Sequence, residues 1–221
     1  MVCDGSGRLS GERRANGRSP IIVGILLAAG ASRRFGAPKL LQTLAGGIPV
    51  ALAAARALQS GTDECVAVVR PEDEQLARLF VEHRVPVVSC PSAAGGMGYS
   101  IACGIRRHRT AHGWIIALAD MPFVRQKTIA GVADLLRNGA SLAAPVHGGR
   151  IGQPVGFGQP FGEALCGLQG DHGARGILES HREALCLYPC DDPGIHWDID
   201  TPADLLRHDS TLRDPDPGQG I

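Results

Sequence analysis

The stretch Leu27–Lys39 combines small residues with cationic side chains, which is the chemistry that binds phosphate groups. Three small residues, Ala28, Ala29 and Gly30, let another molecule approach the backbone closely, and Gly30 can adopt a positive φ angle. Successive amide N–H groups in such a turn bind anions, and Arg34 and Lys39 add positive charge beside them. The stretch therefore favours a polyphosphate site over a plain strand-to-loop junction, although its spacing matches neither a P-loop nor a dinucleotide fingerprint.

An acidic residue, Asp120, follows the apolar run Trp114–Ala119. A carboxylate at the end of a hydrophobic strand costs desolvation energy unless a cation neutralises it. That cation could be Mg²⁺ held with a nucleotide, or the side chain of Arg125 in a structural ion pair. The spacing alone does not choose between them.

Two more carboxylates stand in the segment Asp-Ile-Asp-Thr-Pro that ends at Pro202. If this segment is extended, Asp198 and Asp200 lie on one face and could both bind a metal ion. The alternative is a local one, in which Asp200 or Thr201 caps a helix that begins at Pro202.

Three glycine-rich segments could be simple turns or parts of a ligand site. Gly95–Ile101 leads into a helix with Ser100 near its start, and a second turn contains Gln153. In the third, Asp171 could cap a helix, and Arg175 near that helix start could bind an oxyanion in bidentate fashion. We expect the nearby histidines to be surface or hydrogen-bonded side chains rather than bases, namely His147, His172 and His196.

The elements that must position these residues alternate between strands and helices. Strands are expected at 21–27, 65–69, 85–89, 114–119, 141–146, 154–157 and 184–188. Helices are expected at 50–59, from Pro71 through Phe80, and at 99–108, 126–137, 160–168, 173–181 and 202–207. The short connections predict a doubly wound α/β sandwich with a mostly parallel sheet, which binds its ligands at the carboxyl ends of strands. The two successive helices before residue 181 suggest a lobe that covers the substrate.

The composition is that of a globular protein, since 44% of the 221 residues are apolar and 20% are charged. A formal net charge of zero argues against binding to nucleic acid or to a membrane through bulk charge. Seven scattered cysteines and the lack of a secretory signal or transmembrane stretch indicate a cytoplasmic protein. We expect a disordered extension at 1–20, one domain at 21–208 and a flexible tail at 209–221.

The order of these motifs between residues 21 and 207 resembles that of nucleotidyltransferases, in particular the molybdenum cofactor cytidylyltransferase group. The first stretch meets every fixed position of the family's loop, Leu-Ala-Ala-Gly-x-Ser-x-Arg-x-Gly-x-x-Lys. The later segments resemble the family's Gly-Met-Gly-x-Ser, Leu-x-Asp-Met-Pro, Gly-Asp-x-Gly-Ala-Arg and Asp-x-Asp-Thr-Pro-x-Asp-Leu motifs. Gln153 departs from the pattern, because the family commonly has histidine there, and this leaves the identity of the acceptor open.

The resemblance implies roles for individual residues and a GT-A-like sandwich whose sheet is mixed, with one antiparallel strand in the second half. Nucleotide-binding residues would be Leu27, Ala28, Ala29, Gly30, Ser32, Arg34, Lys39, Gly96, Gly98 and Ser100. Asp120 and Asp200 would bind Mg²⁺, with Asp198 as the second choice. The acceptor would contact Gln153, Asp171 and Arg175. Arg34, Lys39 and Asp120 would be catalytic, in a nucleotide-binding half at 21–125 and an acceptor-binding half at 126–208.

The implied reaction transfers CMP from CTP to the terminal phosphate of a molybdopterin-type cofactor and releases pyrophosphate. A phosphate monoester is already anionic, so alignment and charge neutralisation suffice without a protein nucleophile. The implied partners are CTP and this acceptor, with transient contact to a molybdenum hydroxylase. The alternatives are a related enzyme that uses another nucleoside triphosphate or phosphorylated acceptor, and a non-catalytic accessory protein that carries the cofactor to a molybdenum hydroxylase.

Overall fold

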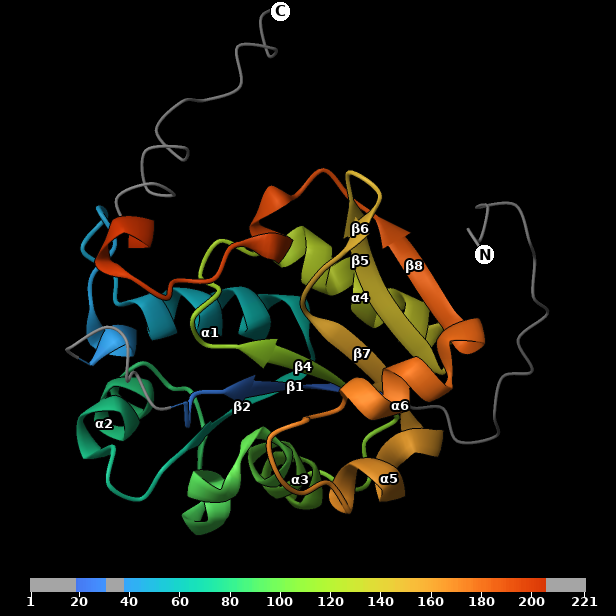
Figure 1. Ribbon diagram of the computed structural model, residues 1–221, viewed down its shortest axis with the longest axis horizontal. Coiled ribbons are helices and arrows are strands. Elements are labelled where there is room, and N and C mark those ends of the chain that lie inside the picture. The colour runs from blue at the N-terminus through green and yellow to red at the C-terminus, as the bar shows by residue number, and fades with distance from the viewer. Residues whose placement is uncertain (1–18, 31–37, 206–221) are drawn as a thin grey trace, which may run out of the picture.

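One mixed sheet of eight strands forms the centre of the computed structural model, which describes residues 19–30 and 38–205 (Figure 1). The strands are β1 (Ile22–Leu27), β2 (Glu64–Val69), β3 (Val87–Ser89), β4 (Gly113–Leu118), β5 (Leu142–His147), β6 (Arg150–Ile151), β7 (Val155–Gly158) and β8 (Leu185–Pro189). Their order is β3-β2-β1-β4-β7-β5, with β8 and the short β6 both paired to β5. β7 is antiparallel to β4 and β5, whereas β8 is parallel to β5. The mixed, mostly parallel α/β sandwich predicted from the sequence is confirmed.

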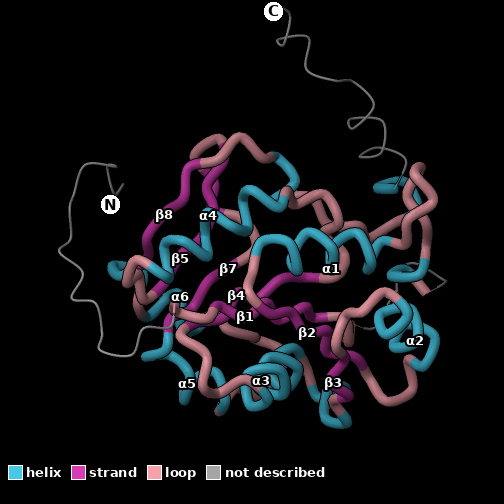
Figure 2. Tube along the Cα trace, turned by 180° about the vertical axis from the view of Figure 1, so that it is seen from behind, coloured by secondary structure: helices cyan, strands magenta, loops and turns pink. Residues whose placement is uncertain are grey.

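Helices cover both faces of this sheet, as the views from the two sides show (Figures 1 and 2). The α-helices are α1 (Val50–Gly61), α2 (Glu74–Glu82), α3 (Met97–Arg107), α4 (Gln126–Arg137), α5 (Gly162–Cys166) and α6 (Arg175–Ser180), and the 3₁₀ turns are η1 (Lys39–Leu41), η2 (Pro91–Gly95), η3 (Gln159–Phe161), η4 (Arg182–Ala184) and η5 (Pro193–His196). Side chains of a strand alternate between its faces. In β1, Ile22 and Leu26 therefore pack with α1 and α4, while Val23 and Ile25 pack with α3 and α5.

Three predicted helices differ from those observed. The helix expected from Pro71 begins only at Glu74, because the chain first makes a turn in which Asp73 N–H donates to the carbonyl of Arg70. The helix expected at 173–181 begins at Arg175, since Gly173 has a positive φ angle that a right-handed helix does not allow. The helix expected at 160–168 is split into η3 and α5.

The first helix of the predicted lobe over the substrate, α5, packs against α3. Leu165 and Cys166 of this helix are buried in the same cluster as Ile101 and Ile105 of α3. Helix α5 is therefore part of the layer that covers one face of the sheet, because its apolar side chains extend the surface already buried by α3.

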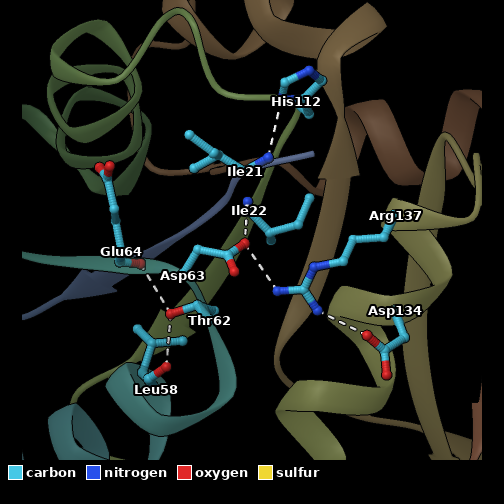
Figure 3. A network of polar contacts seen from close by, with 9 residues as sticks. All are labelled: Ile21, Ile22, Leu58, Thr62, Asp63, Glu64, His112, Asp134 and Arg137. Atoms are coloured by element: carbon cyan, nitrogen blue, oxygen red, sulfur yellow. Dashed lines mark hydrogen bonds and ion pairs between the residues drawn. The ribbon is translucent and has the colours of Figure 1, made fainter. Parts of the chain in front are cut away.

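Polar contacts fix the amino end of β1, at the opposite end of the strand from the predicted phosphate site (Figure 3). Asp63 Oδ2 accepts hydrogen bonds from Ile22 N–H at 2.8 Å and from Arg137 at 2.9 Å. Burial would raise the pKa of the Asp63 carboxyl, but these two donors hold it below its usual value. Arg137 also donates to Asp134 at 2.8 Å. The start of β1 is thus joined to the end of α4.

A buried carboxylate joins the start of α4 to the turn η5. Asp192 is 1% exposed, and its Oδ2 accepts from the backbone N–H of Arg125 and from the hydroxyl of Thr128. Its Oδ1 accepts from Gly194 N–H at 3.0 Å. Arg125 precedes the first residue of α4, so the carboxylate satisfies donors at the positive end of this helix.

The described ranges contain six cysteines, all with free thiols. Cys65 is buried, and burial raises its pKa to about 12. Between residues 19 and 205, omitting 31–37, no helix has the length and hydrophobicity needed to cross a bilayer.

Candidate functional site

The carboxylates of Asp120 and Asp200 converge on one cation, the ammonium group of Lys39. Lys39 Nζ donates to Asp120 Oδ2 at 2.9 Å and to Asp200 Oδ1 at 3.0 Å. Lys39 is only 9% exposed. Burial alone would lower its pKa, but the hydrogen bonds and charges of the two carboxylates outweigh this effect and raise the pKa. Three residues from distant parts of the chain therefore form one charged cluster.

The end of β4 positions Asp120. Ala119 N–H donates to the carbonyl of Leu27 at 3.1 Å, which continues the pairing of β4 with β1 up to the acidic residue. The ion pair to Arg125 considered from the sequence is not formed, because Arg125 donates instead to the carbonyl of Asp191. Asp120 Oδ1 is buried and has no hydrogen-bond partner among the described residues.

A pairing across the fold brings Asp200 to the same place. Ile199 is fully buried, and its N–H donates to the carbonyl of Asp120 at 2.9 Å. Asp204 Oδ2 then accepts from Asp200 N–H and Thr201 N–H, at 3.1 and 2.7 Å, and holds the turn that presents Asp200. Thr201 stands directly before the helical residues that begin at Pro202, and its hydroxyl also donates to Asp204 Oδ2, at 2.8 Å. Asp198 is exposed, and Asp200 is the carboxylate that reaches Lys39.

The predicted phosphate-binding turn lies beside this cluster, at the carboxyl end of β1. Leu27, Ala28 and Ala29 are buried. Gly30 is exposed and does not use the positive φ angle that glycine permits. A Cβ added to it would have no described atom within 4 Å. Among the described residues, the space next to the Gly30 backbone is therefore open. Two further predicted residues, Ser32 and Arg34, lie outside the described residues.

Arg70 was missed in the sequence analysis. It follows β2, and its Nε donates to the carbonyl of Ala29 at 2.7 Å. The signal was available, because a cation directly after the β-branched strand Glu64–Val69 must emerge at the same edge of the sheet as the end of β1.

The glycine segment before α3 is packed tightly against a later loop. Gly96 has a φ angle of 125°, and a Cβ on it would overlap the backbone of Gly170 and the carboxylate of Asp171. Gly98 N–H donates to the carbonyl of Gly170 at 2.8 Å. Close packing of two chain segments thus accounts for both glycines without a ligand. Ser100 is buried in the first turn of α3.

The three predicted acceptor residues contact different parts of the molecule. Gln153 lines a small apolar depression together with Leu118 and Met121, which stand on either side of Asp120 in the sequence. Asp171 lies against the glycine segment and does not cap α6, whose N-terminal residue Ala174 has no side-chain cap. Arg175 forms an ion pair with Glu179 within α6 at 2.7 Å, and its side chain is 82% exposed.

The donor set fits a divalent cation that arrives with a phosphate ligand. Mg²⁺ prefers oxygen ligands and is commonly held by one or two carboxylates together with substrate phosphates. The two carboxylates already converge on one positive charge, and one oxygen of Asp120 lacks a partner. Among the described residues no group of three or more His, Cys, Asp or Glu side chains could hold a metal by itself. A cation here would therefore need further ligands from a substrate or from water to complete its coordination.

The sandwich and the charged cluster at the carboxyl ends of β1 and β4 define a doubly wound α/β protein, a class whose members bind ligands at this edge of the sheet. Within that class, the chain belongs to the family of MobA-like NTP transferase domains, which matches residues 24–186. It is therefore a nucleotidyltransferase by family, and the resemblance seen in the sequence is confirmed. The match ends before Asp200, so the place of this residue in the site rests on the geometry described above.

Two relatives of known name cover most of the chain. Purine catabolism protein PucB of Bacillus subtilis is 32% identical over 202 residues, which are 86% of this chain and 98% of PucB. Nicotine blue oxidoreductase of Paenarthrobacter nicotinovorans is 30% identical over 198 residues, 85% of this chain and 96% of that protein.

Among solved structures, Rv0371c from Mycobacterium tuberculosis has the same fold. Its TM-score is 0.76 at 23% identity, over 86% of this chain and 97% of Rv0371c. A structure of Rv0371c in complex with manganese matches with a TM-score of 0.69 at 22% identity, over 85% of this chain and 97% of that one.

Proposed function

We propose that the protein transfers CMP from CTP to the terminal phosphate of a molybdopterin-type cofactor, in a Mg²⁺-dependent reaction that releases pyrophosphate. One observation carries this proposal. At the edge of the sheet where β1 ends, Lys39 Nζ lies 2.9 Å from Asp120 Oδ2 and 3.0 Å from Asp200 Oδ1. Such a set can serve both a triphosphate and a divalent cation. The family membership and the manganese complex of a protein with the same fold add support.

In this reaction the chain's own residues would mainly bind and align. The amides of the turn after β1, together with Arg34 and Lys39, would bind the triphosphate and the departing pyrophosphate. Asp120 and Asp200 would hold the metal, which when bound supplies positive charge to the phosphate oxygens. The acceptor phosphate is anionic and attacks the α-phosphorus in line, so no side chain has to act as nucleophile or strong base.

We place the remaining predicted residues on the two sides of this cluster. We place the base and ribose near Gly96, Gly98 and Ser100, in the half of the domain at 21–125. We place the acceptor in the half at 126–208, where Gln153 lies next to residues that flank Asp120. The depression that Gln153 lines has a volume of only about 10 Å³, space for one water molecule, so the acceptor ring would bind over it rather than in it. Asp171 would contribute from the loop that packs on the glycine segment, and Arg175 from the start of α6. A molybdenum hydroxylase would receive the product by transient contact.

The test is pyrophosphate release with each of the four nucleoside triphosphates, Mg²⁺ and molybdopterin cofactor. We expect turnover with CTP, and a loss of at least about 100-fold for Asp120→Asn because a ligand of the metal is neutralised. Asp198→Asn is the matched control, since it neutralises an exposed carboxylate of the neighbouring motif and should keep activity. Full activity of Asp120→Asn would refute its role. Turnover with GTP instead of CTP, or cofactor binding without any pyrophosphate release, would favour one of the two alternatives given above.

A further inference from the structure

We infer that Lys39 and a divalent cation are alternative occupants of the two carboxylates, so that the metal is taken up together with the nucleotide. The triphosphate would attract Lys39 and thereby release Asp120 and Asp200 for the metal. This inference rests on the proposed metal–nucleotide site, but it concerns how that site is controlled rather than which reaction it catalyses.

A metal ion that binds the same two oxygens as Lys39 cannot be bound together with its ammonium group. Lys39 Nζ lies 2.9 Å from Asp120 Oδ2 and 3.0 Å from Asp200 Oδ1, and so occupies the space between the two oxygens. A Mg²⁺ ion bound by the same oxygens would lie about 2.0–2.1 Å from each, and Mn²⁺ takes similar oxygen ligands. It would therefore meet the ammonium nitrogen at less than contact distance. One of the two has to leave.

The charges lead to the same conclusion. Two carboxylates and one ammonium carry a net charge of −1, so Lys39 already neutralises half of the negative charge that would attract a divalent ion. The lysine side chain is only 11% exposed and the Asp120 side chain 26% exposed, so water screens their interaction less than it would at a free surface. A divalent ion entering beside the ammonium would be repelled by it at short range.

The chain allows Lys39 to exchange partners. Lys39 begins the short 3₁₀ turn η1, and its ammonium is carried on a flexible four-carbon stem. The turn after β1, where we place the phosphates, begins at the same sheet edge as Asp120, because Ala119 N–H pairs with Leu27. A triphosphate bound there offers Lys39 an anion in place of the two carboxylates. Binding of nucleotide and metal must then strengthen each other by the same factor.

The direct test is Mn²⁺ binding to the free protein, measured by electron paramagnetic resonance without nucleotide or acceptor. We expect Lys39→Met to bind Mn²⁺ at least tenfold more tightly than the wild type, since the competing charge is gone. Lys39→Arg keeps the positive charge and should bind no more tightly than the wild type. The chain has a single other lysine, Lys127, which is exposed on α4, and Lys127→Met is the matched control with unchanged affinity.

A thermal readout covers the case in which Lys39→Met is poorly stable. Without the lysine the two carboxylates repel each other, so Mn²⁺ should raise the melting temperature of Lys39→Met by more than that of the wild type. Equal Mn²⁺ affinities of Lys39→Met and wild type, or no binding by either, would overturn the inference. If the two proteins bind Mn²⁺ with equal affinity while the wild type still releases pyrophosphate, the inference fails but the proposed reaction stands. If Asp120→Asn loses Mn²⁺ binding but Lys39→Met does not change it, the metal binds at Asp120 without displacing the lysine, and the inference is wrong.

Discussion

Replacing the buried carboxylate of Asp192 should strongly destabilise the protein. The side chain is 1% exposed and accepts hydrogen bonds from Arg125 N–H, from the Thr128 hydroxyl and from Gly194 N–H. Asp192→Ala removes all three acceptors and leaves the donors buried. A buried donor without a partner costs about 1–3 kcal/mol, and the loss of a negative charge at a helix N-terminus costs about 0.5 kcal/mol more.

Because such losses are not additive, we expect a decrease of about 3–5 kcal/mol in the free energy of unfolding. Domains of this kind have about 5–15 kcal/mol in total, so the variant should still fold but melt early. Asp192→Asn keeps the shape and one acceptor oxygen, but its amide nitrogen cannot accept. It should lose about half as much.

Urea unfolding followed by circular dichroism measures this loss as a shift of the midpoint at constant slope. Asp191→Ala is the matched control, because the neighbouring carboxylate has a side chain that is 99% exposed and should change stability by less than about 0.5 kcal/mol. A loss below about 1 kcal/mol for Asp192→Ala would refute the view that its three hydrogen bonds hold η5 to the start of α4.

Two further predictions concern the glycine segment and the amino end of β1. Gly96→Ala should destabilise the protein by about 2 kcal/mol or more, because the φ angle of Gly96 is 125° and the new Cβ would overlap Gly170. The control is Gly176→Ala in α6, where no described atom lies within 4 Å of the added carbon. This variant should be neutral or stabilising in the same denaturation assay. Asp63 has a lowered pKa in the folded state, so its contribution is complete above the unfolded pKa of about 3.9 and is lost as the pH falls through the folded value. The Asp63 side chain is 41% exposed, so the stability difference between wild type and Asp63→Asn should be below about 1 kcal/mol. This difference should shrink below about pH 4. A difference that grows on acidification would contradict the assignment.

The layers of the fold and the edge that carries the site could be predicted because they depend on local patterns. Apolar runs bounded by glycine or an acid mark buried strands, and the carboxyl ends of parallel strands must share one edge. Gly30 and Asp120 were placed together by this rule. The antiparallel β7 was expected only from the family resemblance, since no local pattern distinguishes its direction.

The pairing of Lys39 could not be predicted in the same way. Its two partners lie 81 and 161 positions away in the sequence, and a lysine next to a glycine turn has the same local pattern whether it binds phosphate or carboxylate. The cap expected at Asp171 was wrong for a different reason. The left-handed conformation of Gly173 delays the helix start, and glycine does not reveal from sequence alone which conformation it takes.

The site and the stability of the fold rest on different groups, and this is what would allow Lys39 to exchange partners. An ion pair that is largely buried contributes little net stability, because desolvation of the charges offsets their attraction. The segment that carries Asp200 is held instead by the buried side chain of Ile199 and by its hydrogen bond to the carbonyl of Asp120. When the ammonium leaves, these contacts remain. The two carboxylates would then stay in place for a metal ion, whereas a site held together by the lysine alone would open as the nucleotide bound.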